Sequence, residues 1–371
     1  MKIKNCDMYQ FMERLGDRKI IAFARGLQLC SMINMYSHPK GWEKVIKYIV
    51  DNDKYYWNEE CQVKDYTFRV YSPSVLREES AKEAVVVIFS QRCYEIILQL
   101  NEIHELDEME CYIFPLMQTY TNIEQNEFQK SLDEPAIPKK IHYCWFGGNP
   151  LTESAQKCID SWKKYCPDYE IICWNEENYD VNNHLYTKEA YKHKAYAFVS
   201  DYARLEIIYN HGGIYMDTDV EVKRNLDPLL YNRAYCAFSN HVPRIATGLG
   251  FGAVKGFPII KDMMDAYRFE KYEKDDGVNK TLCQAYNTKV LAYHGLIQNG
   301  HYQVIEGMAC YPKDYFDPMS SYFYLAPRAE KAFSIHQSAN TWSQKDLVFK
   351  KVKDKSKKDI YNILEMIEED E

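Results

Sequence analysis

The chain has 371 residues, of which 46% are apolar and 27% are charged, and its formal net charge at pH 7 is −8. This balance is typical of a folded globular protein and favours neither a disordered chain nor a membrane-spanning one. The negative charge argues against a general nucleic-acid binder, which needs a basic face to displace counterions from phosphates. The length is sufficient for two domains, each with its own hydrophobic core.

The cysteines and the first residues predict a cytoplasmic protein. The 12 cysteines are spread along the chain without a C-x-x-C pair, which favours reduced thiols and disfavours structural zinc. Residues 1–7 contain no apolar segment followed by a small-residue cleavage site. No run of about eighteen apolar residues occurs in the chain, so we expect no transmembrane helix.

Strand and helix signals alternate through the first third of the chain. The pattern predicts helices at residues 74–79 and 92–103. The predicted strands are short apolar runs at residues 20–23, 45–50, 68–71 and 84–89. Because strands that alternate with helices form parallel βαβ units, we expect an α/β, doubly wound domain over residues 1–133.

Residues 20–26 and 48–53 resemble the Rossmann-like domains that accompany many sugar-modifying enzymes. A dinucleotide fingerprint needs three glycines, for the turn, for the approach of the phosphate and for helix packing. Two of the three are missing at the corresponding positions, which are Ala24, Gly26 and Leu29. We therefore expect a Rossmann-like scaffold without dinucleotide, although Asp51 lies where an acid would bind the ribose. A nicotinamide-dependent sugar epimerase or oxidoreductase is the alternative.

A polar stretch at residues 131–138, interrupted twice by proline, marks the predicted domain boundary. An apolar strand from residue 140 follows and ends at Gly147 and Gly148, where a ligand could approach the backbone closely. A helix over residues 154–165 and a strand over residues 169–174 come next.

A predicted helix over residues 197–211 ends at Gly212 and Gly213, which favour a left-handed cap. Asp201 and Arg204 are three residues apart on this helix and therefore share a face. Taken alone, this spacing is typical of a surface ion pair.

The tripeptide Asp217-Thr218-Asp219 comes directly after an apolar strand at residues 214–216. Because side chains alternate along an extended backbone, we expect both carboxylates on the same side, facing one point. Two hard oxygens suit Mg²⁺ or Mn²⁺, which fills its other positions with water and substrate phosphates. The tripeptide alone is weak evidence, since Asp51-Asn52-Asp53 is another instance.

A calcium-binding, non-enzymatic domain is one alternative for these acids, with Asp217, Asp219 and Glu221 at alternating positions. An EF-hand loop needs Gly at its sixth position and Glu at its twelfth. The chain has Val222 and Pro228 there, so the spacing excludes this type of site.

Three sequence blocks follow one another in a specific order. They are residues 137–148 (IPKKIHYCWFGG), 200–205 (SDYARL) and 212–219 (GGIYMDTD). Together they resemble the DXD-motif glycosyltransferases of family 32, which is similar to the glucosylating domains of large clostridial toxins and to initiating α-mannosyltransferases of fungi. The resemblance covers residues 137–345 and implies a GT-A type nucleotide-sugar transferase domain with helical additions.

The resemblance implies donor-binding and catalytic roles for matching residues. Trp145 would stack on the nucleotide base, while Asp201 and Arg204 would hold the donor sugar and the ribose. Tyr215 and Trp342 are further implied donor-binding residues. The implied donor is a UDP- or GDP-hexose, which the family transfers with retention of anomeric configuration.

The resemblance also implies a site for Mn²⁺ or Mg²⁺. Asp219 would ligate the metal ion directly, and Asp217 would contact donor hydroxyls and the metal-bound region. Residues 334–342 (SIHQSANTW) are similar to a late family block with two histidines. His336 matches the first of them and Gln337 replaces the second, so His336, Gln337 or water could complete the metal shell.

Cleavage of a sugar-diphosphate bond builds negative charge on the leaving diphosphate. A bound cation acts there as a Lewis acid, and Arg204 with backbone amides adds electrostatic stabilisation. We assign no carboxylate as a nucleophile. The glycine-rich turn at residues 247–252 is expected to line the sugar or acceptor pocket, with a packing turn as the equal alternative.

We expect a glycan or lipid-linked oligosaccharide acceptor in capsular or surface polysaccharide synthesis, by analogy with other cytoplasmic chains that carry such a scaffold. A toxin-like transferase that glycosylates proteins is the alternative, and no nucleic-acid partner is expected. Seven lysines between residues 345 and 358 precede the acidic residues 368–371, so residues 346–371 predict a charged helix or tail. This run could contact the inner face of an anionic membrane, with a solvated helix face as the alternative.

Overall fold

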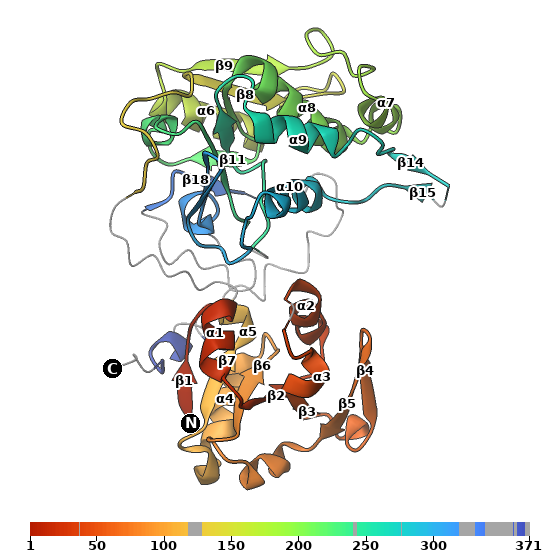
Figure 1. Ribbon diagram of the computed structural model, residues 1–371, viewed down its shortest axis with the longest axis vertical. Helices are drawn as coiled ribbons and strands as arrows, with labels where there is room; N and C mark the ends of the chain where they lie inside the picture. Colours follow the sequence, from red (N-terminus) through yellow and green to blue (C-terminus); the bar gives the residue numbers. More distant parts are fainter. Residues whose placement is uncertain are drawn as a thin grey trace. The chain divides into compact units, whose positions relative to one another are not determined.

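A computed structural model shows the fold in two compact units, which are described separately below (Figure 1). The structure describes residues 1–36, 38–117, 128–239, 243–275, 277–318, 331–337, 359 and 362–367. The N-terminal unit contains residues 1–117 together with 359 and 362–367, and the C-terminal unit contains residues 128–318 and 331–337, within those ranges. No helix among the described residues combines the length and apolar composition that a membrane span requires.

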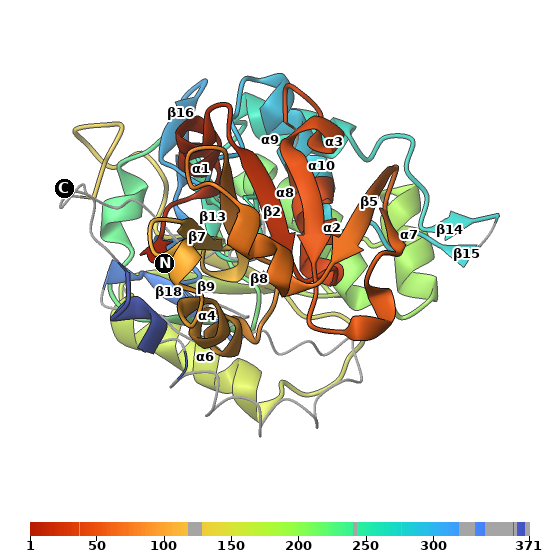
Figure 2. The ribbon, with the colours of Figure 1, turned by 90° about the horizontal axis from the view of Figure 1, so that it is seen from below.

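The N-terminal unit is built on a seven-stranded sheet in the order β1-β7-β6-β2-β3-β5-β4. Only the pairing of β4 with β5 is antiparallel. Strand β2 pairs with β6 on one side and with β3 on the other, and Figure 2 shows it inside the sheet. The strands are β1 (Lys2–Lys4), β2 (Lys19–Phe23), β3 (Ile46–Val50), β4 (Glu60–Val63), β5 (Tyr66–Tyr71), β6 (Ala84–Ile88) and β7 (Glu110–Ile113). The sequence pattern located four of them, whereas β1, β4 and β7 are too short to give a clear period.

Helices cover both faces of this sheet, because its strands are apolar on both sides. Ile20 and Ala22 of β2 belong to one buried cluster, and Ile21 and Phe23 belong to another. The helices are α1 (Met8–Leu15), α2 (Leu27–Met35), α3 (Trp42–Val45), α4 (Cys93–Asn101) and α5 (Phe114–Met117), with 3₁₀ turns η1 (Lys54–Tyr56), η2 (Pro73–Glu78) and η3 (His104–Leu106). The helix predicted at residues 74–79 is therefore a 3₁₀ turn, which begins with Pro73.

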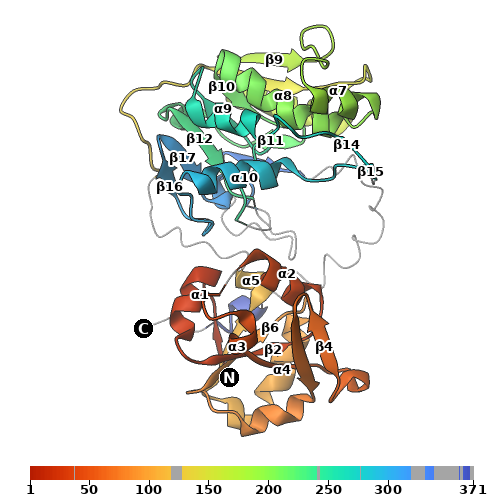
Figure 3. The same cartoon turned by 45° about the vertical axis from the view of Figure 1, so that its right-hand side comes forward.

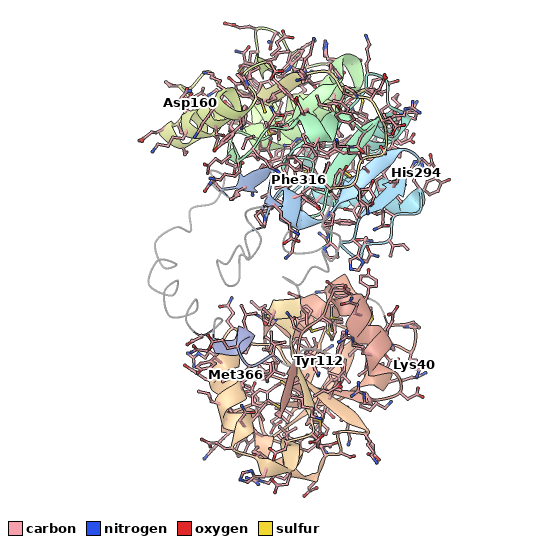
Figure 4. All side chains as sticks on the ribbon, turned by 90° about the vertical axis from the view of Figure 1, so that its left-hand side faces the viewer. Lys40, Tyr112, Asp160, His294, Phe316 and Met366 are labelled. Atoms are coloured by element: carbon pink, nitrogen blue, oxygen red, sulfur yellow. The ribbon has the colours of Figure 1, made fainter. Side chains whose placement is uncertain are left out.

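Residues near the C-terminus complete the N-terminal unit. Ile363 is fully buried in its core, and Ile3 forms a parallel bridge with Ile367. Met366, labelled in Figure 4, packs against the same core. Of the charged helix or tail predicted over residues 346–371, the described part is helical at residues 362–364, and its apolar side chains cover one face of the sheet. The lysine run between residues 350 and 358 lies outside the described residues.

We expect Ile363→Ala to destabilise the N-terminal unit by about 2–4 kcal/mol, because it leaves a cavity in a closed core. Hydrogen exchange resolved by peptide would show the loss of protection in β6 and β7. Leu364→Ala is the matched control, since Leu364 is 37% exposed and its truncation should change protection little. Equal effects of the two variants would contradict the assignment of Ile363 to this core.

The C-terminal unit is built on a mixed sheet in the order β16-β17-β12-β13-β10-β8-β9, which Figure 3 shows from β9 to β16. Strands β9, β8 and β10 are parallel, and β13 runs antiparallel between β10 and β12. The strands are β8 (Lys140–Cys144), β9 (Glu170–Trp174), β10 (Gly213–Tyr215), β12 (Ala234–Ala237), β13 (Phe251–Ala253), β16 (Gln303–Ile305) and β17 (Met308–Tyr311). Two small ribbons pair β11 (Val220–Val222) with β18 (Ser334–His336) and β14 (Glu273–Lys274) with β15 (Gly277–Val278).

Helices pack on this mixed sheet, and two of them, α6 and α8, lie where the sequence predicted helices. They are α6 (Glu153–Tyr165), α7 (Leu185–Lys192), α8 (Tyr196–His211), α9 (Pro258–Asp265) and α10 (Cys283–Tyr293), with 3₁₀ turns η4 (Asp227–Leu230) and η5 (Lys313–Tyr315). Thr152 caps α6 by accepting a hydrogen bond from the amide of Ala155. Each unit thus combines a seven-stranded sheet with packed helices, so both are of mixed α/β architecture.

The boundary between the units lies earlier than residue 133. The Phe128 ring stacks on Tyr311 with centroids 4.8 Å apart, and the Leu132 amide donates to the carbonyl of Tyr231 at 2.9 Å. Ile137 is buried in the core of the C-terminal unit. The prolines of residues 131–138 therefore mark an irregular segment that packs on this unit.

His142 fixes β8 against β10 from inside the C-terminal unit. The side chain is fully buried, with Nε2 2.9 Å from the Gly212 carbonyl oxygen. The Trp174 indole donates to Nδ1 at 3.0 Å, so Nε2 carries the proton of a neutral imidazole. Burial, opposed by the Gly212 bond, lowers the pKa of His142 to about 4.

Acid should therefore weaken this unit. The unfolded His142 binds a proton below its ordinary pKa of 6.5, whereas the folded His142 stays neutral until the pH approaches 4. The stabilisation of the folded state by neutral His142 is therefore complete above pH 6.5 and is lost as the pH falls towards 4. From pH 7 to pH 5 the wild type should lose about 2 kcal/mol more unfolding free energy than His142→Gln, measured by urea denaturation. His104→Gln, at an exposed position, should retain the wild-type slope. An unchanged slope in His142→Gln would contradict this account.

Candidate active site

The candidate site begins on α8, where Asp201 and Arg204 are buried. Nη2 of Arg204 lies 3.1 Å from Oδ1 of Asp201, and Nε donates to the Ser200 carbonyl at 2.8 Å. Their side chains are 12% and 4% exposed, so the pair is not the surface ion pair that the spacing alone favours. Burial raises the pKa of Asp201 to about 6, and the nearby charge of Arg204 opposes this rise.

Arg204 also contacts the first acid of the D-x-D tripeptide. Nη1 donates to Oδ2 of Asp217 at 3.3 Å, and Nη2 lies 3.2 Å from Oδ1. The Tyr215 hydroxyl donates to the same Oδ1 at 3.1 Å. Burial favours a neutral guanidinium, but the charges of its partners outweigh burial and hold the pKa of Arg204 well above its usual range. One guanidinium thus serves two carboxylates, and Asp217, at 31% exposed, is the more accessible of them.

The two acids of the tripeptide lie in a turn that follows β10. The strand ends at Tyr215, and the Val220 amide donates to the Asp217 carbonyl at 3.1 Å, which closes the turn. The Asp217 amide donates to the Gly248 carbonyl at 2.9 Å. The predicted strand therefore ends before both carboxylates, so its alternation does not set their directions.

Asp219 instead pairs with His336. Nε2 of His336 lies 3.2 Å from Oδ1 of Asp219, and the Gln337 amide donates to the Asp219 carbonyl at 2.8 Å. The pairing of β11 with β18 places His336 opposite Val220 and so fixes this geometry. The Gln337 side chain donates to Glu221 at 2.7 Å. The late sequence block thus reaches the tripeptide as the resemblance implies.

Among the predicted metal ligands, Asp217 contacts Arg204 while Asp219 pairs with His336, and the charges of both acids act on His336. Across the described ranges, no three His, Cys, Asp or Glu side chains are arranged to hold a metal ion. Asp219 and His336 are 23% and 26% exposed, and their oxygen and nitrogen donors fit Mn²⁺ or Mg²⁺ with substrate and water oxygens in the other positions. Burial opposes protonation of His336, but its hydrogen bond to Asp219 raises its pKa to about 9, so metal binding would release this proton.

Trp145 lies at the carboxyl end of β8, beside these groups. Its amide donates to the Trp174 carbonyl at 2.8 Å, and its indole donates to the Asn149 carbonyl at 2.6 Å. The preceding residue, Cys144, is close to Arg204 and Asp217. Base stacking by this partly buried ring stays a prediction. Trp342 lies outside the described residues.

Tyr215 lies behind the site. Its side chain is 1% exposed, and the guanidinium carbon of Arg204 is 4.9 Å from its ring centroid. Together with its hydroxyl bond to Asp217, this position shows Tyr215 as a support for the two charged side chains. Direct contact with a donor stays a prediction.

Two further residues, Gly248 and Cys283, belong to the site. A Cβ on Gly248 would lie 2.0 Å from Oδ2 of Asp217, so this position requires glycine. Cys283, the first residue of α10, places its amide and thiol close to the Asp201 carboxylate. The glycine-rich turn did signal the first residue, whereas no local pattern distinguishes Cys283 from the other cysteines.

Part of the C-terminal unit matches a known family in sequence. The model for the glycosyltransferase sugar-binding region containing the DXD motif matches residues 152–235, from the Thr152 cap of α6 to β12. This span includes the Asp201–Arg204–Asp217 contacts and the tripeptide turn. Residues 152–235 are thus similar to the DXD-motif glycosyltransferases. The resemblance seen in the sequence is thereby confirmed, and the C-terminal unit is called the glycosyltransferase unit below, after the matched family.

Curated relatives of this glycosyltransferase are similar over short regions. Inositol phosphoceramide mannosyltransferase 3 of Schizosaccharomyces pombe is 36% identical over 130 residues, which are 31% of this chain and 35% of that protein. Subversion of eukaryotic traffic protein A of Legionella pneumophila is 26% identical over 114 residues, covering 24% of this chain and 18% of that protein. Among solved structures, PaToxG glycosyltransferase aligns with 55% of this chain and 77% of its own, at 17% identity and a TM-score of 0.36. The chain spans less than half the length of these curated relatives.

We expect Gly248→Ala to displace Asp217 from Arg204, because the added methyl group would occupy the position of Oδ2. A displacement of about 1 Å should lower turnover of a nucleotide-sugar donor by about 100-fold. Gly26→Ala is the matched control, since the space around Gly26 is open and its φ is −79°. Turnover by Gly248→Ala at the wild-type rate would contradict the close approach.

Proposed function

We propose that this glycosyltransferase moves a hexose from a UDP- or GDP-sugar to a glycan or lipid-linked acceptor, with retention of configuration. The observation that carries the proposal is the contact of Arg204 with both Asp201 and Asp217 beside the carboxyl end of β8. This places a fixed cation and an accessible carboxylate together at the sheet edge where α/β folds bind ligands.

The residues of the site fit this reaction. Asp217 can accept hydrogen bonds from donor hydroxyls, since it is the more exposed acid on Arg204. The buried guanidinium supplies positive charge near the diphosphate in surroundings that screen it little. A divalent cation held by Asp219 and His336 would act as a Lewis acid towards the leaving diphosphate. No carboxylate is assigned as a nucleophile.

The relatives support a lipid-linked acceptor. One is named as a mannosyltransferase of inositol phosphoceramide, a sphingolipid, and another is named mannosyl phosphorylinositol ceramide synthase. We propose an acceptor with a lipid-linked glycan, in capsular or surface polysaccharide synthesis. A toxin-like protein acceptor remains the alternative. The cytoplasmic location and a membrane contact through the lysine run stay predictions.

For the N-terminal unit we propose a Rossmann-like scaffold without dinucleotide. Its successive parallel strands follow the order β5-β3-β2-β6-β7, which is the 3-2-1-4-5 order of doubly wound nucleotide folds. Ala24 has a φ of +76° in the turn after β2, so its side chain occupies a position that glycine would leave open to a phosphate. This favours the scaffold over a nicotinamide-dependent epimerase or oxidoreductase.

A screen of UDP- and GDP-hexoses for release of nucleoside diphosphate, with Mn²⁺ present, tests the function. At least one donor should be turned over, and Asp217→Asn and Asp219→Asn should each reduce the rate by about 100-fold or more, because each removes charge that orders the reacting groups. Asp53→Asn, in the other D-x-D tripeptide of the chain, should retain the wild-type rate. Absence of turnover with every donor, or full activity of both site variants, would contradict the proposal.

A further inference from the structure

A rigid turn follows β9 and presents Glu176 at the edge of the sheet. The Tyr179 amide donates to the Asn175 carbonyl at 2.9 Å, and the Asn175 amide donates to the Asn178 side chain at 2.9 Å. Asn178 in turn donates to the Cys173 carbonyl at 2.8 Å. These bonds tie the turn to its own strand, so the position of Glu176 is fixed before any ligand binds.

One oxygen of Glu176 holds the glycine pair after β8. Oε1 accepts hydrogen bonds from the Gly147 amide at 2.6 Å and from the Tyr191 hydroxyl at 2.8 Å. Gly147 has a φ of +94°, and a Cβ there would lie 2.3 Å from the Tyr196 ring. Burial alone would raise the pKa of Glu176, but these hydrogen bonds outweigh burial and lower it, so the carboxylate is ionised at neutral pH.

The carboxylate of Glu176 and the indole of Trp145 follow neighbouring strands. Glu176 is exposed, and the hydrogen bonds from Gly147 and Tyr191 both reach Oε1 and leave Oε2 to other partners. Trp145 is two residues before Gly147 and is itself bonded to Trp174, two residues before Glu176. The ionised carboxylate and the indole are therefore held at the ends of adjacent parallel strands, β8 and β9.

We propose that Oε2 of Glu176 accepts hydrogen bonds from the ribose hydroxyls of the donor nucleotide. The inference rests on the proposed function, because it assumes a nucleotide donor at this edge. An ionised carboxylate only accepts hydrogen bonds and repels phosphates, which leaves the hydroxyl groups of the nucleotide as suitable partners. An acid at the end of the strand next to a glycine turn binds a ribose in the same way in doubly wound folds.

The test measures binding of UDP, GDP and their 2′-deoxy counterparts to the full chain by calorimetry, with Mn²⁺ present. The wild type should bind the ribonucleotide about tenfold more tightly than the deoxynucleotide, because a hydrogen bond to a charged group is lost. Glu176→Gln keeps an oxygen for Gly147 and Tyr191 but replaces Oε2 with an amide donor. Its ratio of the two affinities should fall close to one, with the affinity for the deoxynucleotide little changed.

Tyr191→Phe is the matched control, because it removes one partner of Oε1 and leaves Oε2 in place. It should keep the wild-type ratio, which separates ribose binding from a role in holding the loop. An unchanged ratio in Glu176→Gln would overturn the inference, and so would a change confined to the preference between UDP and GDP. If the wild type binds one ribonucleotide without discrimination against its deoxy form, the inference fails while the proposed function stands. If it binds none of the four nucleotides, both fail.

Discussion

The site of the glycosyltransferase unit depends on one buried cation shared by two carboxylates. Arg204 is 4% exposed and is within 3.3 Å of both Asp201 and Asp217. Removal of one partner from such a group costs about 3–5 kcal/mol, because a charge would remain buried without compensation. The surrounding structure follows from this constraint. The Tyr215 hydroxyl supports the Asp217 carboxylate, and Gly248 leaves room for it. The first residue of α10, Cys283, lies close to the Asp201 carboxylate.

The group of three also has a net negative charge. Two carboxylates and one guanidinium leave one charge uncompensated when both acids are ionised, and Asp219 adds another acid close by. His336 balances Asp219 as a cation, which explains why the two ends of the tripeptide face different partners. A divalent cation would therefore replace the proton of His336 beside the second acid, while the first acid stays bound to arginine.

Local pattern predicted most of the elements and the order of the functional blocks, but not the contacts between them. Strands β2, β3, β6, β8 and β9 have clear apolar runs, and Gly212 ends α8 as expected, with a φ of +65°. The turn at Asp217 could not be predicted, because it depends on the carbonyl of Gly248, thirty-one residues away. The burial of Asp201 depends likewise on α10, and the position of Glu176 depends on Gly147, which follows the neighbouring strand β8.

The return of residues 362–367 to the N-terminal unit makes the glycosyltransferase unit an insertion within it. During synthesis, the sheet of the N-terminal unit leaves the ribosome first but lacks Ile363 until the whole inserted unit has followed. Domains generally fold as they emerge, so the inserted unit can reach its native state while its host is still incomplete. The unit that begins second along the chain can thus complete its fold before the unit that begins first.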